Sequence, residues 1–221
     1  MRVRVAIALV LAVTTSAGAA DVLVEDWSPH AVGSKGVPAG WKSQSWGSPK
    51  YDFTIATNGG AKVLHMRSAN EGSTVSKDVK GKVDLTQTPV LEWTWKVTAL
   101  PKGANSCKKA TDDQAGQIFI VWPRFPEAVR SRIIGYVWDS TLPVGTTCKS
   151  EKSGTVTYVV VRSGPADLGK WLTERRNVAE DFKKTYKDDL EPPAAVSVAI
   201  DSNDTGSTAE AFMGTILFRR P

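Results

Sequence analysis

Histidine is scarce in this chain of 221 residues, which contains only His30 and His65. The chain therefore has too few histidines for a three-histidine metal site and few candidates for the histidine of a Ser-His-Asp triad. The Gly-x-Ser-x-Gly and His-Glu-x-x-His signatures are also missing, as is a phosphate-cradling Gly-Lys-Ser/Thr loop. We therefore predict no catalytic residue, although glycoside hydrolysis by two carboxylates needs no histidine and stays open.

Long apolar runs are lacking as well. The run Val5–Val13 is far shorter than the roughly 20 apolar residues that a membrane-spanning helix needs. Because it follows Arg2 and Arg4 and precedes the small residues 17–19, it predicts a secretory signal peptide over residues 1–20. We expect a periplasmic or secreted protein with a single domain over residues 21–221 and no membrane span.

Positively charged residues are only slightly more numerous than negatively charged ones. The chain has 28 Lys and Arg against 23 Asp and Glu, a formal net charge of +5, and loss of Arg2 and Arg4 with the signal peptide would leave 5 − 2 = +3. The lysines are scattered along the chain and form no basic stripe. A nucleic-acid partner is therefore not expected.

Cysteine occurs twice, at Cys107 and Cys148. In an exported protein, an isolated pair is most simply a disulfide. Both cysteines lie in polar, turn-rich segments, and both histidines are remote in sequence, which argues against a catalytic thiol. The bridge would close a loop of 148 − 107 = 41 residues, for which the chain-entropy model gives about 4 kcal/mol of stabilisation.

What the chain does contain is a succession of short extended segments. Apolar and polar residues alternate over residues 89–98, which predicts a half-buried strand, and Asn58-Gly59 predicts a hairpin turn. About ten such strands favour an all-β fold, an antiparallel β-sandwich of the jelly-roll type. The exception is one short helix near residues 178–187, which opens on a capping-box pattern at Asn177 and Glu180.

Several motifs follow one another in order along most of the chain. They are Pro38-Ala39-Gly40-Trp41, Leu91-Glu92-Trp93-Thr94-Trp95-Lys96-Val97, Asp112-Asp113, Tyr136-Val137-Trp138, Gly169-Lys170-Trp171, Glu174-Arg175-Arg176-Asn177-Val178 and Asp201-Ser202-Asn203-Asp204-Thr205. In this order they resemble a bacterial exported family, domain-of-unknown-function family 3047. The resemblance implies a jelly-roll sandwich like that of carbohydrate-binding modules, and it implies no activity. Arg176-Asn177 stands where the family pattern has Arg-Asp, which weakens any acid/base role there.

Aromatic residues are the first candidates for a binding site. Trp93 and Trp95 share one face of their strand, and Tyr136 and Trp138 share one face of another. Such rings either stack on sugar rings or fill the core. We predict Trp95, Tyr136 and Trp138 as ligand-binding residues, with Trp95 or Trp138 as the ring that faces solvent.

Charged residues are the second candidates. Asp112 and Asp113 lead into a buried strand, and because neighbouring strand residues point to opposite faces they do not form a dyad by themselves. Arg175 and Arg176 precede the helix, where a carboxylated sugar would fit. All four are predicted to bind ligand. The alternatives are a strand-entry turn for the acids and, for the arginines, ion pairs with Asp112, Asp113 or Asp181.

Asp201, Asn203 and Asp204 form a dense polar segment between two alternating apolar runs. Clustered oxygen ligands suit a structural Ca²⁺ ion. The segment lacks the length and the terminal Glu of an EF-hand loop, so a polar hairpin turn between two strands is the stronger interpretation. We expect no other cofactor.

Together, these features favour an exported, non-catalytic binding module. It would hold a glycan or another polar or saccharide-like ligand on one sheet face. The alternative is a polysaccharide-acting hydrolase or lyase that uses Asp112 or Asp113 with Arg175, Arg176 or Tyr136. A further alternative is a structural envelope protein without a small ligand. The oligomeric state is left open.

Overall fold

The computed structural model describes residues 20–221, so the predicted signal peptide lies almost wholly outside the described residues. No helix in this part of the chain is long and apolar enough to cross a bilayer. In chain order the elements are β1 (Val22–Glu25), β2 (Lys42–Ser43), β3 (Asp52–Asn58), β4 (Ala61–Ala69), β5 (Gly72–Asp78), β6 (Val90–Ala99), β7 (Gly116–Trp122), α1 (Glu127–Arg130), β8 (Arg132–Asp139), β9 (Thr147–Lys149), β10 (Val156–Ser163), β11 (Leu172–Asn177), α2 (Val178–Tyr186), β12 (Ala195–Asp201) and β13 (Thr208–Arg219).

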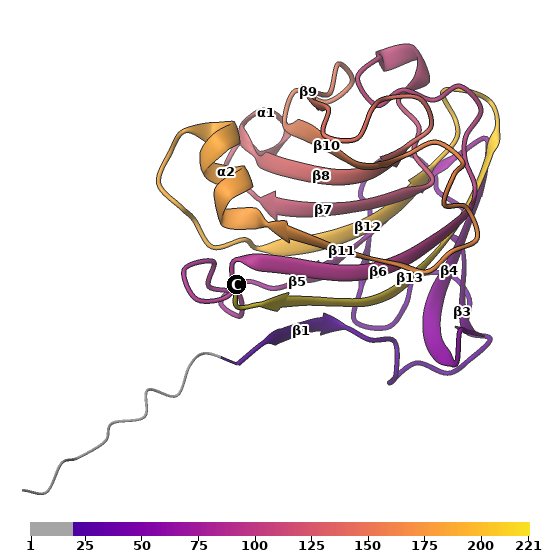
Figure 1. Ribbon diagram of the computed structural model, residues 1–221, viewed down its shortest axis with the longest axis horizontal. Coiled ribbons are helices and arrows are strands. Elements are labelled where there is room, and N and C mark those ends of the chain that lie inside the picture. Colours follow the sequence, from indigo (N-terminus) through magenta and orange to yellow (C-terminus); the bar gives the residue numbers. More distant parts are fainter. Residues whose placement is uncertain (1–19) are drawn as a thin grey trace, which may run out of the picture.

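The strands form two sheets stacked face to face (Figure 1). The first has the order β11-β6-β13-β4-β3, with β1 pairing to the far part of β13, and the second has the order β2-β5-β12-β7-β8-β10-β9. Alternate residues of β6 and β13 point towards the second sheet and join one continuous apolar core. The predicted all-β sandwich is confirmed.

The second sheet departs from the prediction in one respect, because β10 runs parallel to β8. The chain leaves β8, forms β9 within the segment 140–155, and returns so that β10 lies between β8 and β9. A parallel neighbour requires a crossover of about a dozen residues or more, and this segment is long enough. The sheet is therefore mixed, and the purely antiparallel expectation was wrong for this pair.

The predicted hairpin at Asn58-Gly59 joins β3 to β4, with Asn58 paired to Ala61. Gly59 and Gly60 both have positive φ, at 62° and 81°. This backbone conformation costs little only for glycine, so the local sequence sets the register of the two strands. The prediction is confirmed.

The predicted short helix is α2, which lies at one end of the sandwich (Figure 1). The Asn177 side chain accepts the Glu180 N–H at 3.1 Å, which is the N-cap bond of a capping box, and its amide donates to the Glu180 carboxylate at 2.8 Å. Val178 and Phe182 are buried, and the Phe182 ring lies 4.9 Å from that of Trp122. A one-turn helix that we did not predict, α1, lies between β7 and β8.

The predicted disulfide between Cys107 and Cys148 is present and ties the 102–111 loop to β9. Among residues 20–221 there is no free cysteine.

Candidate functional site

The aromatic residues predicted to bind ligand lie in the core. Trp95, Tyr136 and Trp138 are each 1% exposed or less. Trp93 and Trp95 of one sheet face Tyr136 and Trp138 of the other, with ring centroids 5.5 and 5.8 Å apart. The prediction that Trp95 or Trp138 faces solvent is wrong, because the apolar side of β6 is the side that faces the opposite sheet.

Hydrogen bonds inside the protein occupy the polar tips of the three rings predicted to bind ligand, whereas the buried indole N–H of Trp93 has no partner. The Trp95 indole N–H donates to Glu174, that of Trp138 to the Gly164 carbonyl, and the Tyr136 hydroxyl to Asp181. Burial raises the pKa of Tyr136 well above its ordinary value, and the neighbouring Asp181 raises it further. Tyr136 is therefore a structural hydrogen-bond donor and no general base in the neutral range.

The predicted acidic residues Asp112 and Asp113 are also buried, at 3% and 0% exposure. Asp112 accepts hydrogen bonds from Gln114 and Ser150, and burial raises its pKa. Asp113 uses both carboxylate oxygens to accept the backbone N–H groups of residues 204 and 205, at 3.0 and 2.6 Å. These acids hold loops together and do not line an open groove.

The polar segment after β12 closes over Asp113. Asp201 is half-buried, and burial together with the charge of Asp113 raises its pKa to about 8. Asp204 forms an ion pair with Lys152, and Asn203 donates its backbone N–H to Asp201. Among the described residues no three His, Cys, Asp or Glu side chains are grouped as a metal site would need. The Ca²⁺ ion at Asp201, Asn203 and Asp204 therefore remains an untested prediction.

The two adjacent arginines point to opposite faces of β11. Arg176 points inward and forms a two-point ion pair with Asp181, at 2.6 and 3.0 Å, which was one of the alternatives for this residue. Arg175 points outward, and its side chain is 64% exposed and pairs with Glu92. Arg175 is the more exposed of the two, since the Arg176 side chain is 36% exposed and is engaged at two points by Asp181.

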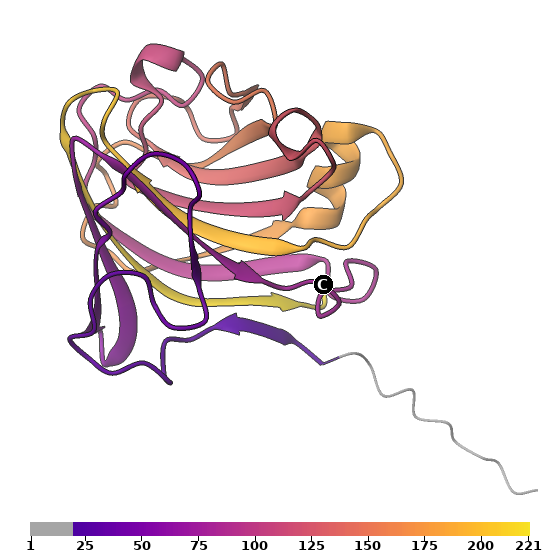
Figure 2. The same cartoon turned by 180° about the vertical axis from the view of Figure 1, so that it is seen from behind.

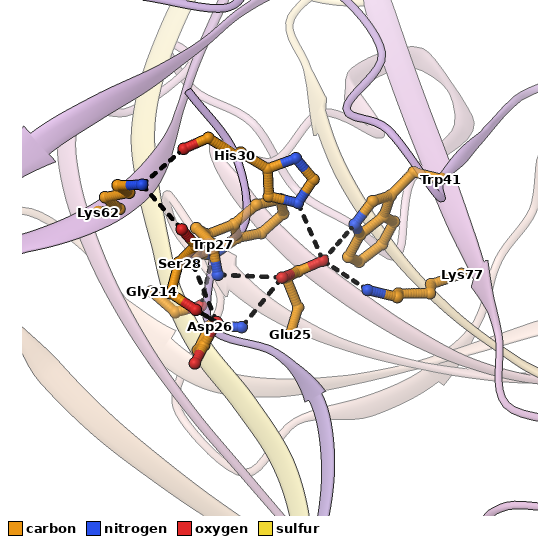
Figure 3. Close-up of polar contacts among 9 residues, drawn as sticks. All are labelled: Glu25, Asp26, Trp27, Ser28, His30, Trp41, Lys62, Lys77 and Gly214. Carbon is orange, nitrogen blue, oxygen red and sulfur yellow. Dashed lines mark hydrogen bonds and ion pairs between the residues drawn. The ribbon is translucent and has the colours of Figure 1, made fainter. Parts of the chain in front are cut away.

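A second polar cluster surrounds Glu25, near the start of the described chain (Figure 3). The carboxylate is 3% exposed. It accepts the indole N–H of Trp41 at 2.9 Å, the ammonium of Lys77 at 2.5 Å and the backbone N–H of Trp27 at 3.0 Å, and it lies 3.4 Å from His30. Burial raises the pKa of Glu25, but these donors outweigh it and lower the value to about 2.

The Glu25 cluster fastens the N-terminal segment to the sandwich. The rings of Trp27 and Trp41 stack at 5.4 Å, and the Trp27 indole donates to the Gly214 carbonyl on β13. Figure 2 shows the segment after β1 passing across this side of the sandwich, and its residues 33–36 hydrogen-bond to the outer edge of β3. The carboxylate is fully occupied, so this cluster is a structural anchor.

The side of the first sheet that points away from the second, which we call the outer face, carries a different set of residues. Its members alternate with core residues along the same strands: Lys96 lies between Trp95 and Val97, and Phe212 between Ala211 and Met213. Strand pairing places Lys96 opposite Phe212, Phe212 opposite His65, and His65 opposite Thr54.

Three flat rings lie on this outer face. The Phe212 and His65 rings stack at 4.2 Å and an interplanar angle of 6°. Trp171 immediately precedes β11 and lies edge-on to Phe212, with ring centroids 6.4 Å apart. The Trp171 ring is half-buried and fits against Gly59, where an added Cβ would come within 3.0 Å of the indole nitrogen. The hairpin turn thus positions the ring.

Lys96 lies between the rings, with its ammonium 4.4 Å from the centre of Phe212 and 5.5 Å from that of Trp171. It donates to the Asn58 side-chain oxygen at 2.7 Å, and the Trp171 indole N–H donates to the same oxygen at 3.1 Å. Within residues 20–221, no carboxylate lies within 4.0 Å of this ammonium. An ammonium has three N–H donors, so Lys96 retains capacity for a further acceptor.

The acids of the outer face are already paired. Glu210 accepts from Thr98 at 2.6 Å and contacts His65 at 2.7 Å, and these contacts lower its pKa. Asp52 forms a two-point ion pair with Arg67. The face therefore combines aromatic surface, paired polar groups and one cation without a carboxylate partner.

Two hollows lie elsewhere. One of about 320 Å³ is lined by residues 81–86 and 190–192, and one of about 240 Å³ by residues 29–31, 34–39 and Ile55. Neither brings together a set of charged or aromatic side chains comparable to the outer face. We therefore take the outer face as the candidate site.

The sequence contained a signal for this site that our prediction did not use. Lys96 occupies a polar position of the alternating strand 89–98, and Trp171 lies in one of the motifs quoted above. Strand alternation separates Trp95 from Lys96 reliably, but it does not tell which side meets the second sheet. The sequence prediction chose Trp95, Tyr136 and Trp138 because aromatic rings are numerous on one side of their strands. A strand side that is rich in rings is typical of the side that packs into the core.

The family comparison agrees with the motifs. Residues 39–217 match the family described as a protein of unknown function (DUF3047), and the chain belongs to that family. No curated protein matches the chain.

The solved structures with a similar fold include carbohydrate-binding modules. A family 30 carbohydrate-binding module from a cellulosomal cellulase of Clostridium thermocellum has a TM-score of 0.49 at 10% identity, over 91% of this chain and 98% of that one. A family 29 carbohydrate-binding module has a TM-score of 0.39 at 12% identity, over 90% and 87%. A cellulase derived from Rhodothermus marinus has a TM-score of 0.44 at 10% identity, over 80% and 92%. These likenesses concern sandwich architecture, and at such scores they carry no argument about a ligand.

Proposed function

We propose that the protein is an exported, non-catalytic binding module that holds a saccharide-like ligand on the outer face. The observation that carries the proposal is the row formed by Trp171, Lys96, Phe212 and His65. It places the half-buried rings of Trp171 and His65 and the buried ring of Phe212, 9% exposed, beside a cation without a carboxylate partner. The Cys107–Cys148 disulfide is consistent with an oxidising compartment. We place the protein in the periplasm or the medium.

The chemistry of the outer face suits a sugar. The faces of a sugar ring are apolar C–H surfaces, and these pack against aromatic rings such as Trp171. The edges of a sugar carry hydroxyls, which need hydrogen-bond partners. Lys96, Glu210 and Thr54 lie beside the rings on neighbouring strands and provide both donors and acceptors.

The hydrolase or lyase alternative is less well supported. Hydrolysis by two carboxylates requires an accessible pair about 5 to 9 Å apart with a sugar between them. Asp112 and Asp113 are buried and accept hydrogen bonds from their own loops, and Tyr136 is completely buried. A ligand has no access to these groups in this arrangement.

The test combines a glycan array with calorimetry on the wild-type protein and on Trp171→Ala. We expect binding to a subset of glycans and a loss of about tenfold in affinity for the variant, because a stacked ring contributes on the order of 1 kcal/mol beyond its buried area. Trp46→Ala is the matched control, since Trp46 is 63% exposed and lies in the loop between β2 and β3, outside the row of Trp171, Lys96, Phe212 and His65. No binding on the array, or equal losses in both variants, would refute the proposal.

A further inference from the structure

The charges of the outer face are unevenly matched. The face carries four cations, Lys96, Arg67, Arg175 and Arg219, and three acids, Asp52, Glu92 and Glu210, and a fourth acid, Asp21, lies near Arg219. Asp52 is paired with Arg67, and Glu210 with His65 and Thr98. Two places along β6 have more cations than carboxylates in direct contact with them.

The first place is Lys96, whose ammonium has a neutral amide oxygen and two aromatic faces as its neighbours. An amide oxygen and ring faces attract a cation without neutralising it. A carboxylate or sulfate group that approached from solvent would meet a full positive charge beside a ring on which its sugar could stack.

The second place is Glu92, where Arg175 and Arg219 share one carboxylate. Both arginines contact the same oxygen of Glu92, and Asp21 is a further acid near Arg219, so Arg175 shares the one carboxylate that it contacts. The Arg175 side chain is 64% exposed and keeps guanidinium donors available. Glu92 and Lys96 are four residues apart on one face of β6, a separation of about 13 Å at the usual strand rise.

From this arrangement we infer that the ligand is an acidic oligosaccharide lying along β6, with one acidic group at Lys96 and another at Arg175 and Arg219. This inference rests on the proposed function and adds the charge of the ligand to it. Two cationic positions about 13 Å apart fit a chain of several sugar units, because a single sugar cannot reach both. Carboxylated and sulfated sugars share the required chemistry.

The experiment measures calorimetric affinity for three oligosaccharides of equal length: an oligouronate, a sulfated oligosaccharide and a neutral oligosaccharide. We expect the wild-type protein to prefer one of the acidic ligands by at least tenfold over the neutral one. Lys96→Met keeps the apolar stem and should lose about tenfold or more in affinity for the acidic ligand, because hydrogen bonds to charged groups are the stronger kind. Lys96→Arg should retain most of the affinity.

Lys149→Met serves as the control, because Lys149 is exposed on β9 at the edge of the other sheet. It should leave all three affinities unchanged. Raising the salt concentration from 50 to 500 mM should weaken acidic binding and leave neutral binding unchanged, since the contacts are partly exposed to screening.

The outcomes separate the inference from the proposed function. Equal affinity for neutral and acidic oligosaccharides, or an unchanged affinity in Lys96→Met, would overturn the inference and leave the binding-module function standing. Failure of the wild-type protein to bind any of these ligands or any glycan on the array would overturn both.

Discussion

The Glu25 cluster and the Lys96 cluster are built from similar parts and differ in how the central charge is compensated. Each places one charged side chain beside two aromatic rings and an N–H or amide group. Glu25 is 3% exposed and is matched by the ammonium of Lys77 and by neutral N–H donors. Lys96 is half-buried and has a single neutral acceptor, Asn58.

This difference separates a structural charge from a charge available to a ligand. A buried ion stabilises a protein only when its hydrogen-bonding capacity is filled, because desolvation is otherwise too costly. Glu25 meets that condition and joins the N-terminal segment to β5. Lys96 avoids the desolvation cost because it remains near solvent. Since its hydrogen-bonding capacity is not filled within the protein, we expect it to contribute less to stability than Glu25 does.

The largest expected effect is that of Glu25→Gln. The amide keeps the shape but leaves Lys77 without its ion-pair partner, which should cost about 3 kcal/mol of folding free energy and lower the melting temperature by roughly 10 °C. The pKa of Glu25 is lowered to about 2 in the folded protein. Its contribution is therefore present above its ordinary pKa and is lost as the pH falls through about 2.

Thermal unfolding of the wild-type protein and Glu25→Gln at several pH values between 7 and 2 measures this effect. The difference between the two should shrink as the pH falls below 4.5, and glycan binding at pH 7 should not change. A variant as stable as the wild-type protein at pH 7 would show that the Glu25 cluster is not an anchor.

A stability effect of intermediate size is expected for Asp201→Asn. Asp201 is a third acidic or basic side chain whose charge is not fully balanced by its neighbours. Its pKa is raised to about 8 by burial and by Asp113, so the folded state binds a proton that the unfolded state releases near pH 4. Stability from this group is present at low pH and falls as the pH rises towards 8. Asp201→Asn should therefore stabilise the protein by about 2 kcal/mol at pH 8 and by much less at pH 4.

Chemical denaturation at pH 4, 6 and 8 checks the sign. Asp189→Asn, an exposed carboxylate on the loop after α2, is the matched control and should change stability by less than about 0.5 kcal/mol at each pH. A destabilising effect of Asp201→Asn at pH 8 would contradict the raised pKa of Asp201, because the carboxylate would then be ionised and held by favourable contacts.

The smallest stability effect is expected for Lys96→Met. The substitution removes the cation–π contacts with Phe212 and Trp171, but the apolar stem still covers the rings, so the change should be below about 1 kcal/mol. Denaturation curves recorded beside those of Glu25→Gln give the comparison directly. A loss as large as that of Glu25→Gln would make Lys96 a structural residue.

The predictions made from consecutive residues were confirmed, as was the two-layer sandwich, whereas two predictions that depended on where particular strands lie were wrong. The Asn58-Gly59 hairpin and the Asn177 cap of α2 are written in consecutive residues, because positive φ and N-capping are local requirements. The parallel partner of β10 and the burial of Trp95 and Trp138 depend on where a distant strand lies. No pattern in consecutive residues indicates where that distant strand lies.

The amino-acid order alone determined which residues share a face of each strand, since side chains alternate with a period of two whatever the fold. It also determined the cysteine pair, because the chain offers each cysteine no other partner. Only the tertiary structure decided which face is covered. Stacking the second sheet on the Trp93 and Trp95 side buried those rings, and it left Lys96 on the solvent side of its sheet.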